Sequence, residues 1–161
     1  MTSLKKQLSR GFTIVELLIV IVVIGILAAL VIVTYNGIQQ KARDTERKTD
    51  INAVASHSEA YNAENGRYPS LAQINDGTAT TGFRALNMKG LPTAAVYDPK
   101  GDSTDTTAFA DAAAANVYAY TPAPAGCDNG VAGGTGGDCV SYVLTATLEG
   151  APGTYVKQSS N

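Results

Sequence analysis

Three aspartates in one loop are the side chains best suited to bind a metal ion. Asp98, Asp102 and Asp105 lie close together, beside the turn-forming residues Pro99 and Gly101. Carboxylate oxygens are the ligands that Ca²⁺ prefers in proteins, so these aspartates form a candidate calcium site. Their spacing does not follow the EF-hand pattern, and aspartates also recur in loops that simply face solvent. A solvated loop without metal is therefore the expected state, and no cofactor is required.

A second segment matches one unit of a calcium-binding repeat. Residues Gly133–Val140 follow the pattern G-G-x-G-x-D-x-U, with Asp138 at its acidic position. Such units build calcium sites only when several copies stack, and the sequence contains a single copy. This segment is predicted to be a plain loop.

The groups that acid–base or nucleophilic catalysis needs do not come together in this sequence. Its single histidine, His57, lies in the stretch Ser56-His57-Ser58, and no Ser-His-Asp or Cys-His unit is visible around it. The glycine run Gly133–Gly137 does not lie between a strand and a helix, as a phosphate-binding loop would. The chain is therefore not expected to be an enzyme, and His57 is expected to be a surface or packing residue.

Two cysteines, Cys127 and Cys139, lie in the C-terminal quarter of the chain. A zinc site would need two further ligands, and His57 is far away in the sequence. If this quarter is exported, the expected outcome is a disulfide, because cysteines pair in oxidising compartments.

The segment Phe12–Val33 is apolar except for one ionisable residue, Glu16. As a helix rising about 1.5 Å per residue it would span roughly 33 Å, which is the thickness of the hydrocarbon core of a bilayer. Lys5, Lys6 and Arg10 precede it and favour a cytoplasmic N-terminus with the C-terminus outside. The basic residues that follow are interleaved with acidic ones, so they oppose this orientation only weakly.

Two ordinary explanations of this segment each leave an observation unexplained. A secretory signal has a shorter apolar stretch of roughly 7–15 residues and a small-x-small cleavage site. The stretch here is longer, and Val31–Gly37 offers no such site. A simple membrane anchor fits the length but gives no role to Glu16. A carboxylate costs roughly 2.5–3.5 kcal/mol at the centre of a membrane-spanning helix, and less near its end, so it is usually kept for a partner.

The motif Gly11-Phe12-Thr13-Ile14-Val15-Glu16 resembles the type III signal of type IV pilins and pseudopilins. The resemblance implies that residues 1–11 are a leader peptide and that a membrane aspartic peptidase cleaves between Gly11 and Phe12. It also implies that the new amine of Phe12 is methylated and that Glu16 acts in assembly.

One departure from the family concerns helix-weakening residues. Many members carry a proline near the end of the apolar segment, whereas the first proline here is Pro69. Gly25 is the remaining helix-weakening residue in the span, and a filament subunit that unwinds would do so there. Close packing of helices at this glycine is an equally good explanation of its presence.

Residues 12–65 are predicted to form one long helix in two parts. Residues 12–36 make the transmembrane and polymerisation part. Residues 37–65 make an amphipathic part that ends at Asn65-Gly66, because Tyr68-Pro69 prevents its continuation. One stripe of the amphipathic part has helical spacing and is expected to pack on a sheet: Ile51, Val54, Ala55, Ser58 and Tyr61.

Residues 66–161 are the predicted globular head. Residues 66–116 are interpreted as a connecting region with a short helix at Ala108–Ala115. Residues 117–161 are expected to form an antiparallel sheet with a disulfide loop, its strands being Val117–Thr121, Cys139–Leu148 and Thr154–Gln158. The predicted fold class is α+β, a long N-terminal helix packed on a small antiparallel β-sheet head, as in pilins.

The resemblance implies a structural function. The first interpretation is a pilin, a subunit of a type IV pilus surface filament that serves adhesion, twitching motility or DNA uptake. The alternative is a pseudopilin of a type II secretion or competence machine. Either subunit would span the inner (cytoplasmic) membrane once and then enter an extracellular filament at the cell surface.

The partners that the resemblance implies are further copies of the same chain, the membrane, the prepilin peptidase and the pilus assembly motor and platform. From Ile51 onward the sequence has five basic and ten acidic residues. A head with this charge repels phosphate backbones, so it is not expected to bind nucleic acid.

Overall fold

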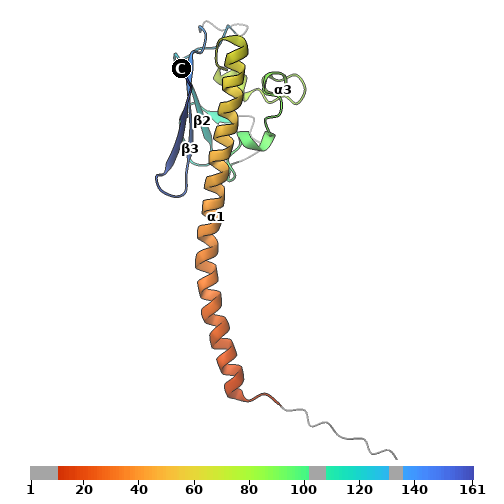
Figure 1. The fold of residues 1–161 in the computed structure, drawn as a ribbon, viewed down its shortest axis with the longest axis vertical. Helices are drawn as coiled ribbons and strands as arrows, with labels where there is room; N and C mark the ends of the chain where they lie inside the picture. Colours follow the sequence, from red (N-terminus) through yellow and green to blue (C-terminus); the bar gives the residue numbers. More distant parts are fainter. Residues whose placement is uncertain (1–10, 102–107, 131–135) are drawn as a thin grey trace, which may run out of the picture. The chain divides into compact units, whose positions relative to one another are not determined.

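The computed structural model of the chain describes residues 11–101, 108–130 and 136–161. The chain divides into two compact units, with the boundary between Gln39 and Gln40. The fold class is α+β, as predicted, with a long N-terminal helix followed by a four-stranded sheet (Figure 1).

Helix α1 runs from Ile14 to Asn65 without interruption. It ends where the sequence predicts, because Gly66 takes a positive φ of 72° and its amide still donates to the carbonyl of Asn62 at 2.7 Å. Glycine adopts this left-handed conformation without the steric cost of a side chain, so it is the usual residue after the last helical turn.

The first unit contains the apolar part of α1. All residues from Gly11 to Ile32 are exposed within the chain, including large side chains such as Ile24 and Leu30. In the part of the chain that the structure describes, α1 is the one helix that is long and apolar enough to cross a membrane. No described residue of the same chain therefore covers this surface.

The second unit contains a sheet with the strand order β1-β2-β3-β4 (Figure 1). Strands β2 and β3 are antiparallel, as are β3 and β4, whereas β1 runs parallel to β2. The sheet is therefore mixed, and the prediction of a purely antiparallel sheet is wrong for its first strand. The strands are β1 (Phe109–Ala110), β2 (Tyr118–Ala123), β3 (Ser141–Thr147) and β4 (Thr154–Gln158).

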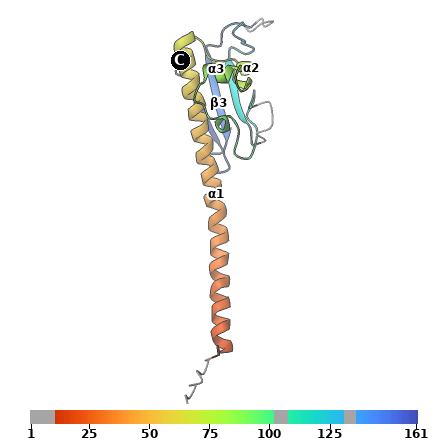
Figure 2. The ribbon, with the colours of Figure 1, turned by 90° about the vertical axis from the view of Figure 1, so that its right-hand side faces the viewer.

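The core of the second unit lies between the later turns of α1 and the sheet (Figure 2). The predicted stripe is confirmed, since its residues are all buried, with Tyr61 the most exposed of them at 5%. The facing side chains come from β2 and β3 and are mostly aromatic: Tyr118, Tyr120, Tyr142 and Leu144. The side chains of β3 alternate as the period of a strand requires, because Leu144 and Ala146 point inward while Val143 and Thr145 are half-buried.

Three short helices connect α1 to the sheet: α2 (Leu71–Asn75), α3 (Phe83–Asn87) and the 3₁₀-helix η1 (Thr93–Val96). Helix α2 begins with a capping box, in which Ser70 and Gln73 each accept from the backbone amide of the other. At the other end of α2, Asn75 donates to the carbonyl of Phe109 and accepts from its amide, at 2.9 and 2.8 Å.

This clamp explains why the predicted helix at Ala108–Ala115 is wrong. The stretch is rich in alanine and has good helix propensity, but its Phe109 is fully buried and forms strand β1. Asn75 holds the backbone of Phe109, and β2 pairs with it through Tyr118. Burial of the aromatic ring and these pairings outweigh a preference worth only a few tenths of a kcal/mol per residue.

Candidate processing and assembly site

The predicted cleavage junction lies just before α1. Gly11 and Phe12 are not part of the helix, both are exposed, and the Phe12 side chain is 90% exposed. A Cβ built on Gly11 would meet nothing within 4 Å. Exposed, non-helical backbone is what a peptidase can reach, so the junction is accessible from the side of this chain. Leader residues 1–10 lie outside the described residues.

Glu16 forms part of a helix cap together with Thr13. The amide and hydroxyl of Thr13 donate to Glu16 Oε2 at 2.8 and 2.7 Å, and the Glu16 amide donates to Thr13 Oγ1 at 3.2 Å. This reciprocal arrangement is a capping box, which satisfies amides that the first turn of a helix would leave unpaired.

The cap gives Glu16 a role within its own subunit that was not among the predictions. Its sequence signature, a threonine followed three residues later by a glutamate before an apolar run, is present at Thr13 and Glu16. The second carboxylate oxygen, Oε1, makes no hydrogen bond with the residues that the structure describes. Glu16 can therefore hold the cap and still accept from another group.

Gly25 lies inside α1, which passes through it as regular helix. A Cβ at this position would meet nothing within 4 Å, so no contact in its own chain requires a glycine. Helix weakening at Gly25 stays a prediction, and so does close packing against the helix of another subunit.

The predicted disulfide between Cys127 and Cys139 is present, and Cys139 is fully buried. A buried asparagine that was not predicted fastens the loop between them to the rest of the head. Asn129 donates from Nδ2 to the carbonyl of Tyr68 and to Oε1 of Gln73, both at 2.7 Å. Its Oδ1 accepts from the amide of Cys139 at 2.8 Å.

Of the three candidate calcium residues, the structure describes Asp98. Asp98 is 5% exposed, and both its oxygens accept from Arg47, at 2.7 and 2.9 Å. A metal ion there would have to displace the arginine. Asp102 and Asp105 lie outside the described residues, and across the described ranges no three potential ligands converge. Asp138 pairs instead with Arg67 at 2.8 Å.

Arg47 is the centre of a charge network that sequence patterns did not reveal. Its side chain is 1% exposed, and besides Asp98 it donates to Asp44 at 2.8 Å and to Glu149 at 3.0 Å. Glu149 also accepts from both Arg43 and Lys100, at 2.7–2.8 Å. The network links α1 to the loop after η1 and to the turn between β3 and β4.

The charges of this network balance, and hydrogen bonds favour the ionised forms of Glu149 and Asp44. The Arg43 and Lys100 side chains keep the pKa of Glu149 well below its usual range. Burial raises the pKa of Asp44, but the amides of Glu149 and Gly150 and the Arg47 side chain outweigh burial and lower it. Asp44 points inward, so it pairs with Arg47 and with the backbone amides of Glu149 and Gly150 rather than with Lys48 one helical turn away.

Comparison with known proteins identifies the same N-terminal segment, with its cleavage junction and apolar helix. The family model "Prokaryotic N-terminal methylation motif" matches residues 6–32. A type II secretion system core protein G from Klebsiella michiganensis is 37% identical over 98 residues, which are 60% of this chain and 63% of that protein. The same protein from Aeromonas hydrophila is 33% identical over 104 residues, covering 62% of this chain and 73% of the relative.

A type IV pilin is also similar to the chain. The type IV major pilin protein PilA of Myxococcus xanthus is 38% identical over 64 residues, which cover 40% of this chain and 29% of the pilin. No solved structure matches the chain at a significant level. The methylation motif, the exposed apolar helix and the match to most of a core protein G together show that the chain belongs to the type IV pilin and pseudopilin family.

Proposed function

We propose that this chain is the repeating structural subunit of a helical filament, with no catalytic role of its own. The observation that carries the proposal is the continuous apolar surface of α1, which is exposed from Ile14 to Ile32 and lies within the segment that the methylation-motif model matches. A soluble protein rarely exposes so much apolar surface. Lipid would cover it before assembly, and the same segments of neighbouring subunits would cover it in the filament.

Between the two kinds of filament, we favour a pseudopilus of a secretion machine. The matches to core protein G run over 98 and 104 residues. They must therefore extend beyond α1 into the head, since α1 has 52 residues. A surface pilus, serving adhesion, twitching motility or DNA uptake, is the second candidate, supported by the likeness to PilA of Myxococcus xanthus. In either case a membrane platform and motor would extract the subunit from the cytoplasmic membrane.

The two candidates predict different losses when the gene is deleted. If the subunit builds a pseudopilus, the deletion strain should retain in its cells proteins that the parent strain releases, while long surface filaments persist. If it builds a pilus, the filaments should disappear and the released proteins should stay the same. Quantitative proteomics of the culture medium and electron microscopy of the cells measure both, and complementation with the intact gene is the control.

The free oxygen of Glu16 suggests how subunits find their register. Cleavage would create one new positive charge per subunit, the amine of Phe12. In an assembled core without water, an unpaired carboxylate would cost several kcal/mol. We propose that Glu16 Oε1 accepts from the Phe12 amine of an adjacent subunit, so that any stagger which separates the two charges is penalised.

Glu16→Gln should therefore be inserted and cleaved normally but assemble poorly or with an altered helical rise. Glutamine can replace glutamate in a capping box, so this variant removes the charge and keeps the cap. Thr13→Val is the matched control, because it removes the two hydrogen bonds of the Thr13 hydroxyl and keeps the charge of Glu16. Counting filaments and measuring their rise by cryo-electron microscopy tests the idea. Normal filaments of Glu16→Gln together with defective ones of Thr13→Val would contradict it and assign Glu16 to the cap alone.

A further inference from the structure

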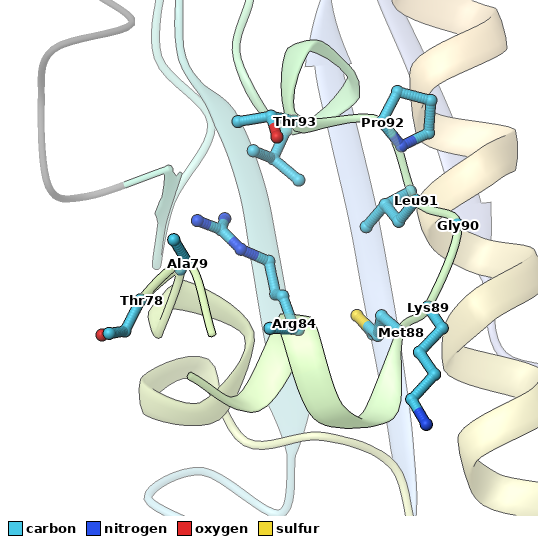
Figure 3. A pocket seen from close by; sticks show the side chains of 12 residues that line it. Thr78, Ala79, Arg84, Met88, Lys89, Gly90, Leu91, Pro92 and Thr93 are labelled. Atoms are coloured by element: carbon cyan, nitrogen blue, oxygen red, sulfur yellow. The ribbon is translucent and has the colours of Figure 1, made fainter. Parts of the chain in front are cut away.

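A pocket in the head has no part in the filament role described above. Its volume is about 350 Å³, and it lies between α3, the turn that precedes α3 and the segment that leads into η1 (Figure 3). The larger apolar side chains among its lining residues are Met88, Leu91, Pro92 and Val96. All of these elements belong to the second compact unit.

Arg84 brings a positive charge into this pocket. Figure 3 shows its guanidinium directed toward Ala79 and Thr93. Its Nη1 atom is buried and has no hydrogen-bond partner among the residues that the structure describes. Buried polar groups in native proteins almost always have a partner, and leaving a charged donor without one is especially unfavourable. The guanidinium that lines this pocket therefore keeps one buried donor without a partner.

The acidic residue Asp76, which interacts with Arg84 through its charge, does not pair with it. Asp76 lies close enough to interact electrostatically with Arg84, but no ion pair joins them among the described residues. Its Oδ1 accepts from the amide and hydroxyl of Thr78, and its Oδ2 accepts from the amide of Phe83 at 3.0 Å. Both oxygens are thus used to hold the turn before α3, and the guanidinium is left for an external acceptor.

The shape and charge of the pocket select the class of that acceptor. A guanidinium offers two parallel donors that match the two oxygens of a carboxylate. Lys89 lies at the pocket, but Figure 3 shows its ammonium pointing away from Arg84, so one cation faces the interior. A single cation beside the apolar side chains of Met88 and Leu91 suits a carboxylate with a short apolar body better than a phosphate. The acidic surface of the head also disfavours polyanions.

We propose that this pocket binds an organic carboxylate through Arg84. The carboxylate has two possible sources, a small diffusible acid or an acidic residue of a second copy of this chain. The second source rests on the proposed filament, whereas the first does not. In both cases the carboxylate pairs with the guanidinium and its carbon chain packs against Met88 and Leu91.

The first test uses the full chain dispersed in detergent and sodium butyrate as the probe, so it does not depend on assembly. Butyrate should shift the NMR signals of the α3 region in a saturable way, whereas butan-1-ol, which has no charge, should not. Arg84→Gln should weaken butyrate binding about tenfold or more, because it removes the charged fork. Lys89→Gln is the matched control, and binding should change by less than about twofold, since its charge points away.

A second variant perturbs Arg84 without removing it. A Cβ at Gly77 would lie 2.8 Å from Arg84 Cζ, so Gly77→Ala should push the guanidinium aside and also weaken butyrate binding. The proposal is wrong if butyrate does not bind the wild-type chain, or if folded Arg84→Gln and Gly77→Ala bind it as tightly as wild type. Inorganic phosphate binding more tightly than butyrate would overturn the assignment to organic carboxylates.

The second test identifies the source. If a neighbouring subunit supplies the carboxylate, assembled filaments should bind at least about tenfold less butyrate per subunit than dispersed chains, because the pocket is already filled. If the ligand is a diffusible acid, filaments and dispersed chains should bind butyrate equally. Either result is independent of whether the filament is a pilus or a pseudopilus.

Discussion

Replacing Gly11 with leucine should leave the uncleaved precursor in the membrane and abolish filaments. The peptidase must approach the backbone on both sides of the bond to Phe12, and glycine leaves that backbone uncovered. Gly11 is exposed and a Cβ there meets nothing within 4 Å, so the substitution should not disturb the fold of the chain itself. Loss of processing would then be a direct effect on recognition. Intact-mass measurement of the membrane-bound subunit detects the retained leader, residues 1–11.

Gly11→Ala serves as the graded control, because a methyl group obstructs the backbone less than an isobutyl group. It should be processed partially, with filaments in proportion to the cleaved fraction. Filaments built from Gly11→Leu chains that still begin at Met1 would refute both the cleavage assignment and the role of the Phe12 amine in assembly.

Replacing Arg47 with methionine should destabilise the head by roughly 3–5 kcal/mol, because it leaves the Asp98 carboxylate buried without its partner. The side chains of Arg47 and Asp98 are each about 1% exposed, so water cannot replace the arginine as hydrogen-bond donor to the carboxylate. Small domains are stable by only about 5–15 kcal/mol, so this loss is a large fraction of the total. The sequence has no tryptophan, and four tyrosines lie in the core, so near-ultraviolet circular dichroism of the full chain in detergent reports unfolding of the head.

Arg43→Met is the matched control, since Arg43 makes the same kind of bidentate contact with Glu149 at a side chain that is 25% exposed. It should cost no more than about 1 kcal/mol, as partly exposed ion pairs do. The double variant Arg47→Met/Asp98→Leu should recover much of the lost stability, because no unpaired charge remains buried. Equal destabilisation by Arg47→Met and Arg43→Met would show that the buried ion pair contributes no more to the stability of the head than the partly exposed one.

Features that depend on neighbours in the sequence could be predicted without a structure. The apolar segment, the Gly11-Phe12 junction and the end of α1 at Asn65 follow from composition and local spacing. The buried stripe of α1 and the alternation of β3 follow from periodicity, because a helix repeats about every 3.6 residues and a strand every two. The cap formed by Thr13 and Glu16 was equally local. The cap was missed because Thr13 and Glu16 also belong to the processing motif, which already gave Glu16 a role in assembly.

Other features were decided by contacts between distant residues. Arg47 and Asp98 are 51 positions apart. The sequence indicated only that basic and acidic residues are interleaved around Arg47. Phe109 joins the sheet because Asn75 clamps its backbone from 34 positions away, which overrides the helix propensity of the alanines around it. Arg84 forms no ion pair with any described residue, and its neighbour Asp76 is hydrogen-bonded to the turn before α3 instead.

The physical reason is the same in each case. Local patterns state which face of an element avoids water, but they do not state which other element will cover that face. Asp98 illustrates the difference, since an aspartate in a loop can bind a metal ion as well as pair with an arginine. Only the packing of α1 against that loop placed Arg47 within 2.7 Å of it, and in a buried site a carboxylate pairs with the cation that the fold supplies.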